Sequence, residues 1–140
     1  MHRAAIRVLP WGALCLVWGK MRILIVESDP DLGQLWQRHM QRQDMETRLE
    51  AGQSGAICAL QTQYFDIVVL DLVLKQGSAM AVADFASYRH PDTQIIFVTN
   101  TSFFSDGSIF ALNANTRAFL QSDTPPEDLT AMVAHYTRAV

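Results

Sequence analysis

The sequence predicts an α/β domain of the doubly wound class, a (βα)5 three-layer sandwich in which helices cover both faces of a five-stranded parallel sheet. Short runs of branched apolar residues alternate along the chain with segments whose apolar residues repeat at helical spacing. Strands that are apolar throughout are buried on both faces, as in a parallel sheet between two helical layers. With 140 residues, 49% of them hydrophobic, the chain is long enough for one such domain.

Residues 1–20 differ from the rest of the chain, because all 14 acidic residues follow Lys20. Their uncharged segment, residues 8–19, contains Pro10 and is shorter than the ~20 residues of a bilayer-spanning helix. A cleaved signal peptide is one interpretation. We expect instead an N-terminal extension outside the fold, since Met21 stands where a compact domain would begin, and one domain over residues 21–140.

The first two strands and helices follow Met21. RILIV at residues 22–26 is an apolar run of strand length, and Ser28-Asp29-Pro30 then starts a helix, with Asp29 expected as its N-cap. The apolar face of that helix carries Leu32, Leu35, Trp36, His39 and Met40. Residues 46–50 are a weaker, polar strand candidate, and the short helix after them carries Ala56, Ala59 and Leu60.

Three further strands are predicted at residues 65–71, 94–99 and 117–120, where the chain reads FDIVVLD, QIIFVT and RAFL. The third helix ends before Pro91, and its buried side carries Met80, Ala83, Phe85 and Ala86. Ile109 and Leu112 indicate a short fourth helix. Thr124-Pro125-Pro126-Glu127 combines a capping box with proline in the first turn and so starts the last helix, which carries Leu129, Met132, Val133 and Tyr136.

Polar residues follow the strands at the positions where this class of fold binds ligands, beyond the carboxyl ends of the strands. They are Glu27-Ser28-Asp29, Asp71, Thr99-Asn100 and Gln121-Ser122. Asp71 is either a nucleophile at the rim of the sheet or only the residue that ends a buried strand. Function depends on which of the two it is.

Four segments resemble the receiver domain of two-component response regulators: ILIVESDPDL, FDIVVLDLVLKQGSA, IIFVT and AFLQS, at spacings close to those of the family. The resemblance covers residues 21–140. It implies a flavodoxin-like fold with strand order 2-1-3-4-5 and a cytoplasmic role in phosphorelay signalling.

The resemblance also implies roles for individual residues. Asp71 would be the phosphoacceptor, taking a phosphoryl group from a histidine kinase. Mg²⁺ would be held by Glu27, by Asp71 and by the backbone carbonyl of Val73. Thr99 would be the switch hydroxyl, and Phe119 the switch aromatic that moves with it.

The chain departs from the family in the metal site. Ser28 replaces the acidic residue whose carboxylate usually touches the metal, so we expect weak Mg²⁺ binding, because Mg²⁺ needs nearly octahedral oxygen ligation. Asp29 could compensate only if the loop turned differently, and the N-cap role is the favoured one for it.

The chain also departs from the family in the positive charge of the pocket. Ser122 stands at the position of the usual lysine, and a hydroxyl cannot supply the charge that pairs with the acceptor and its phosphate. Asp123 adds a negative charge nearby, and Asn100 replaces a smaller residue. Lys75 replaces the usual proline four residues beyond the acceptor; it could restore the charge, but a solvated lysine in a surface turn is expected.

We therefore predict a pseudo-receiver, a binding module in which phosphorylation of Asp71 is weak or absent. A fully functional Mg²⁺-dependent phosphoacceptor is the first alternative, and an unrelated flavodoxin-like domain is the second. No enzyme is expected, since a haloacid-dehalogenase-type hydrolase needs a second aspartate where the chain has Val73. A flavin site would need a Ser/Thr/Gly-rich loop after the first strand, where the chain has residues 27–30, Glu-Ser-Asp-Pro.

The expected partners are proteins: a histidine kinase, a phosphotransfer protein, a downstream effector or a second copy of the chain. The resemblance places the contact on the fourth helix, fifth strand and fifth helix, roughly residues 105–138. A stand-alone domain is expected, because the sequence ends at Val140. With 14 acidic and 8 basic residues, residues 21–140 carry a formal charge of −6, which disfavours nucleic acid, and no membrane contact is expected. Two cysteines without a disulfide framework, Cys15 and Cys58, fit a reducing cytoplasm.

Overall fold

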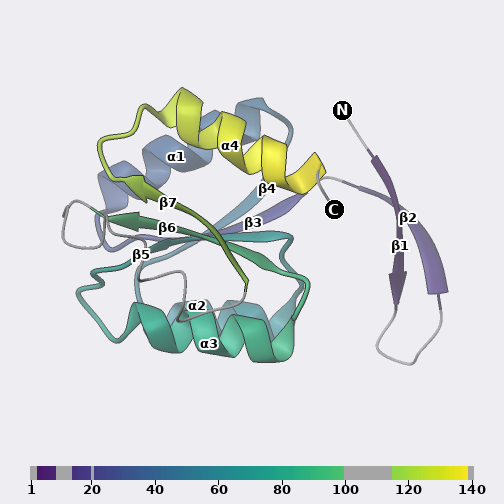
Figure 1. The fold of residues 1–140 in the computed structure, drawn as a ribbon, viewed down its shortest axis with the longest axis horizontal. Coiled ribbons are helices and arrows are strands. Elements are labelled where there is room, and N and C mark those ends of the chain that lie inside the picture. The colour runs from purple at the N-terminus through teal and green to yellow at the C-terminus, as the bar shows by residue number, and fades with distance from the viewer. Residues whose placement is uncertain (1–2, 9–13, 20, 100–114, 139–140) are drawn as a thin grey trace.

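The computed structural model describes residues 3–8, 14–19, 21–99 and 115–138. A five-stranded parallel sheet forms the centre of the α/β unit (Figure 1). Its strands are β3 (Arg22–Val26), β4 (Glu46–Glu50), β5 (Ile67–Asp71), β6 (Gln94–Thr99) and β7 (Thr116–Gln121). They lie in the order β4-β3-β5-β6-β7, which is 2-1-3-4-5 when counted from Met21. The predicted fold class and strand order are confirmed.

In the described part of the chain, four helices cover the two faces of this sheet (Figure 1). They are α1 (Pro30–Arg42), α2 (Gln53–Thr62), α3 (Ala79–Arg89) and α4 (Pro126–Arg138). Helices α1 and α4 lie on one face, and α2 and α3 on the other (Figure 1). The predicted helix at Ile109 and Leu112 lies outside the described residues, as does Asn100.

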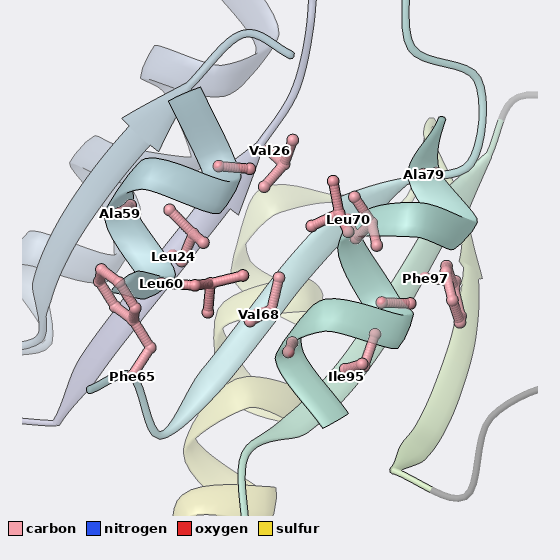
Figure 2. Close-up of a cluster of buried hydrophobic side chains, with 14 residues drawn as sticks. Leu24, Val26, Ala59, Leu60, Phe65, Val68, Leu70, Ala79, Ile95 and Phe97 are labelled. Atoms are coloured by element: carbon pink, nitrogen blue, oxygen red, sulfur yellow. The ribbon is translucent and has the colours of Figure 1, made fainter. Parts of the chain in front are cut away.

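Each face of the sheet has its own apolar core, because successive strand residues point to opposite faces. Figure 2 shows the core beneath α2 and α3, where the strands contribute Leu24, Val26, Val68, Leu70, Ile95 and Phe97. The core beneath α1 and α4 receives Ile23, Ile25, Ile67, Val69, Ile96 and Val98 from the strands, together with Trp36 and Met40 from α1. Burial on both faces explains why these strands read as uninterrupted apolar runs.

Helix α1 begins as the sequence predicts. The side chain of Asp29 accepts hydrogen bonds from the backbone N–H groups of Asp31, at 3.0 Å, and Leu32, at 3.4 Å, so its role as N-cap is confirmed. Gly33 lets the helix lie close to the sheet, since a Cβ atom there would be 2.7 Å from Leu49 Cδ1 and 3.5 Å from Glu27 Cβ. The first turn of α1 is therefore held beside the end of β3.

The extension contains two strands that the sequence analysis did not predict. Strands β1 (Arg3–Val8) and β2 (Leu14–Gly19) pair antiparallel and form a sheet separate from the five parallel strands (Figure 1). Within the described ranges, no helix has the length and apolar character needed to cross a membrane.

Candidate functional site

A pocket of about 310 Å³ opens at the carboxyl edge of the sheet. It is lined by Glu27, Ser28, Asp29, Leu32, Asp71, Val73, Lys75 and Ser122. Five of the predicted site residues therefore line one pocket: Glu27, Ser28, Asp71, Val73 and Ser122. Three carboxylates and one ammonium group belong to the lining side chains, so negative charge exceeds positive charge in this pocket.

Parallel pairing places the two central carboxylates next to each other. Val26 of β3 lies opposite Leu70 of β5, so the residues that follow them, Glu27 and Asp71, leave the sheet side by side. Both strand ends lie at the same edge, since adjacent parallel strands run in the same direction. The expected juxtaposition of Glu27 and Asp71 is present.

Glu27 is buried, with 4% of its surface exposed. Its Oε1 accepts a hydrogen bond from the backbone N–H of Asp29 at 3.1 Å, and its buried Oε2 receives no hydrogen bond from a described residue. Burial, helped by the neighbouring Asp71 carboxylate, raises the pKa of Glu27 to about 8. A hydrogen bond between the two carboxyl groups requires a proton on one of them, which is how Asp71 favours the neutral form of Glu27. In the described part of the chain, no cationic side chain bonds Glu27 Oε2.

Asp71 ends β5 and is half-buried. Its Oδ1 accepts a hydrogen bond from the backbone N–H of Val73 at 2.9 Å, and the N–H of Leu72 donates to the carbonyl of Val98 at 2.9 Å. The carboxylate thus caps the end of the strand and faces the pocket at the same time. The two roles that the sequence left open for Asp71 are compatible.

Thr99 and Phe119, the predicted switch pair, are not among the residues that line the pocket. Thr99 ends β6 and is fully buried, on the face of the sheet that it shares with Phe97. Phe119 of β7 lies opposite Phe97 and packs against the core beneath α2 and α3. The N–H of Ser122 donates to the carbonyl of Thr99 at 2.7 Å, which ties the ends of β6 and β7 together.

Ser28 connects three loops at the pocket edge. Its hydroxyl donates to the carbonyl of Ala51, at 2.8 Å, and accepts from the backbone N–H of Lys75, at 2.9 Å. The position of the missing acidic ligand is therefore used to join the loops after β3, β4 and β5. Sequence reasoning missed this network, because neither partner of the serine hydroxyl is a side chain.

A second anchor holds the loop between β5 and α3. The side-chain oxygen of Gln53, at the start of α2, accepts from the backbone N–H of Ser78 at 2.8 Å. The backbone N–H of Gln53 donates to the carbonyl of Gln76 at 3.1 Å. Gly77 has φ +86°, a left-handed conformation that glycine adopts without strain. The loop that carries Val73 and Lys75 is therefore fixed at both ends.

Comparison with known families decides the identity of this fold. The profile of the response regulator receiver domain matches residues 23–134. The chain belongs to the receiver domain family of response regulators. Receiver domains are typically non-enzymatic signalling modules of two-component systems, which interact with histidine kinases, phosphotransfer proteins or effectors.

Similar proteins agree with this assignment. Over 110 residues, this receiver domain is 30% identical to the response regulator protein PilR of Pseudomonas aeruginosa, covering 79% of this chain but only 24% of PilR. A CheY-like receiver domain protein from Methanospirillum hungatei has the same fold, with a TM-score of 0.79 and 21% identity over 86% of this chain and 96% of its own.

A response regulator from Burkholderia pseudomallei also shares the fold of this receiver domain, with a TM-score of 0.71 and 15% identity over 83% of this chain and 72% of its own. It was crystallised with a phosphorylated aspartic acid, a calcium ion and citrate. At these identities, the likeness to the two solved structures shows the fold alone.

Receiver domains typically bind Mg²⁺ at the phosphorylation site, and the donors in this pocket fit such an ion in a reduced form. In the described part of the chain, no three His, Cys, Asp or Glu side chains are arranged to hold a metal. Glu27 and Asp71 nevertheless bring two carboxyl groups to the pocket, and no described residue donates a hydrogen bond to Oε2 of Glu27. Two carboxylates, with water in the remaining positions, are a common ligand set for Mg²⁺.

Proposed function

We propose that this receiver domain signals mainly by binding other proteins, and that Asp71 accepts a phosphoryl group weakly or not at all. The observation that carries this proposal is the bonding of Ser28. Its hydroxyl donates to one backbone group and accepts from another, so it supplies no carboxylate and keeps only one of its two lone pairs for a metal.

The chemistry of phosphorylation explains why these substitutions matter. An oxygen of Asp71 would form a bond to phosphorus while the bond from phosphorus to the donor nitrogen breaks, and negative charge spreads over the phosphoryl oxygens. Mg²⁺ bound by Glu27, Asp71 and the carbonyl of Val73 would offset that charge. Because burial raises the pKa of Glu27 to about 8, this side chain is mostly protonated at pH 7 and offers little charge to a cation. Ser122 can donate a hydrogen bond to the transferred group but brings no positive charge.

A fully functional phosphoacceptor is the second candidate, and the pocket supplies an observation in its favour. Asp71 faces the same pocket as Glu27 and Lys75, so a nucleophile, a second carboxylate and a cationic side chain are all present. A relative with the same fold carries a phosphorylated aspartic acid, which supports Asp71 as the acceptor if the reaction occurs.

We propose that residues 21–140 form the receiver domain, that residues 1–20 lie outside it, and that the domain works in a reducing cytoplasm. Its partner would be a histidine kinase, a phosphotransfer protein, an effector or a second copy of the chain. The described part of the proposed contact surface is β7 with α4. Strand β7 lies at one edge of the sheet, and no strand of the described residues pairs with its outer side, which supports a role in contact.

The proposal is tested by amide NMR spectra recorded first with Mg²⁺ and then with added beryllofluoride, a mimic of the phosphoryl group. We expect small, unsaturated shifts near Glu27 and Asp71 at millimolar Mg²⁺, and no further change at Thr99 or Phe119 with the mimic. Saturable shifts that extend to Phe119 would overturn the proposal in favour of the functional phosphoacceptor. Asp71→Asn serves as the control that identifies shifts arising from the pocket.

The contact surface has its own test. Asp128 is exposed on α4, and Asp84 is exposed on α3 at the other face of the sheet. We expect Asp128→Lys to weaken binding to a histidine kinase or phosphotransfer protein from the same organism by about 10-fold or more, because it reverses a charge at the contact. Asp84→Lys is the matched control, and an equal effect of both variants would contradict the proposed surface.

A further inference from the structure

The charges of the pocket are unbalanced in a way that singles out Lys75. Three of its lining residues are acidic: Glu27, Asp29 and Asp71. Lys75 is the single cationic residue among the described residues that line the pocket. It is also the only lysine between Met21 and Val140, so no other lysine of the domain can take its place.

The backbone of Lys75 is held at the pocket by bonds that a mobile surface loop would lack. Its N–H donates to Ser28 Oγ at 2.9 Å, and the next residue, Gln76, accepts from the N–H of Gln53 at 3.1 Å. The loop after β3 and the start of α2 therefore fix the base of the lysine side chain. Because the base is fixed, the side chain loses less conformational freedom when it extends over the carboxylates.

Among the described residues, few backbone or cationic donors reach the carboxyl groups of Glu27 and Asp71. Glu27 is buried, and its Oε2 receives no hydrogen bond from any described residue. Asp71 lies beside it and accepts one hydrogen bond, from Val73, at Oδ1. A positive charge in the same small pocket interacts with the Asp71 carboxylate more strongly than it would in bulk water.

We propose that Lys75 is the resident cation of this pocket, which offsets the charge of Asp71 and competes with divalent cations for it. The inference deepens the proposed function, on which it rests, by giving a second reason for weak metal binding besides the loss of the acidic ligand at Ser28. Lys75 is exposed and makes no ion pair with a described residue, so its charge acts across the pocket and not through a direct contact. A purely solvated lysine, as expected from the sequence, would have no effect on metal binding.

The test is a Mg²⁺ titration of the full chain, followed by the amide signals of Glu27 and Asp71. Lys75→Gln removes the charge and keeps a polar side chain that is only one atom shorter, so we expect it to bind Mg²⁺ about 3- to 10-fold more tightly than the wild type. Lys75→Arg keeps the charge and should bind like the wild type. Arg42→Gln is the matched control, because it removes one positive charge at the far end of α1, about 18 Å along that helix from the pocket.

The outcomes separate this inference from the proposed function. Tighter binding by Lys75→Gln, with Arg42→Gln unchanged, supports the inference. Equal binding by Lys75→Gln and the wild type overturns it, as does an equal gain in Arg42→Gln or no detectable binding in any variant. Beryllofluoride added to the wild type tests the proposed function alone. Saturable binding of the mimic would overturn the pseudo-receiver and leave the comparison of Mg²⁺ affinities to decide the role of Lys75.

Discussion

The hydroxyl of Ser28 accepts a hydrogen bond from the backbone N–H of Lys75 at 2.9 Å, and it joins the loop after β3 to the loop after β5. The same hydroxyl donates to the carbonyl of Ala51 at 2.8 Å. A position that lines the acidic pocket thus stabilises the loops around it. Replacing this serine separates the two possible uses of the position, metal binding and loop anchoring.

Ser28→Asp is expected to strengthen Mg²⁺ binding by about 10-fold, because a third carboxylate joins Glu27 and Asp71. The same change removes the donor to Ala51 and is expected to lower the free energy of unfolding by about 1 kcal/mol. Isothermal titration calorimetry measures the first effect and urea denaturation the second. Ser28→Ala is the control, since it loses the anchor without adding a ligand; equal Mg²⁺ affinity in the two variants would contradict the prediction.

The stability of the domain should fall as the pH rises from about 4.5 to about 8, through the burial of Glu27. Folding raises the pKa of this carboxyl from 4.5 to about 8, so between these values the folded state holds a proton that the unfolded chain has lost. The unfolding free energy therefore decreases with rising pH across this window and levels off above it.

Glu27→Gln tests the origin of this pH dependence. The amide is neutral at every pH, so the variant should be more stable than the wild type by roughly 2–4 kcal/mol at pH 9 and should lose the slope between pH 5 and pH 8. Urea denaturation at pH 5, 7 and 9 provides the measurement. Glu46→Gln, at an exposed glutamate of β4, should keep the slope of the wild type. A slope that survives in Glu27→Gln would exclude Glu27 as its source.

Restoring the missing carboxylate and the missing lysine should allow Asp71 to bind a phosphoryl mimic. The double variant Ser28→Asp/Ser122→Lys supplies a carboxylate for the cation and a positive charge for the phosphate oxygens. We expect it to bind beryllofluoride in the presence of Mg²⁺, with amide shifts that reach Phe119. Adding Asp71→Asn should abolish this response. If the double variant stayed silent in a folded sample, the two substitutions would not be the cause of the weak site.

Trp36 should be a core residue and not an anchor for partners. Only 1% of its surface is exposed, and it packs against the core between α1, α4 and the sheet. Trp36→Ala is expected to lower the free energy of unfolding by about 3–5 kcal/mol, as for other large aromatic side chains removed from cores. Tyr88→Ala, at a tyrosine that is 86% exposed, should change it by less than about 0.5 kcal/mol. Circular dichroism during urea denaturation measures both.

Much of the fold followed from local pattern. The apolar runs at residues 22–26 and 94–99 coincide with β3 and β6, and Asp29 caps α1 as expected. Such features depend on neighbours in the chain or on burial of a whole strand, and both leave a signal in the sequence. The strands of the extension could not be predicted in this way, since a short apolar segment is ambiguous between strand and helix.

The doubly wound class, the parallel sheet and the carboxyl-edge position of Glu27, Asp71 and Ser122 could be predicted from the sequence, because each depends on periodicity and on the direction of the strands. Three relationships became visible only in the folded chain: the hydroxyl of Ser28 holds the backbone of Lys75, Lys75 lines the acidic pocket, and Glu27 is buried with no described residue donating to its Oε2. These relationships join loops that are distant along the chain through backbone hydrogen bonds and burial. Backbone groups are the same in every residue, so no pattern of side chains can reveal which of them will meet.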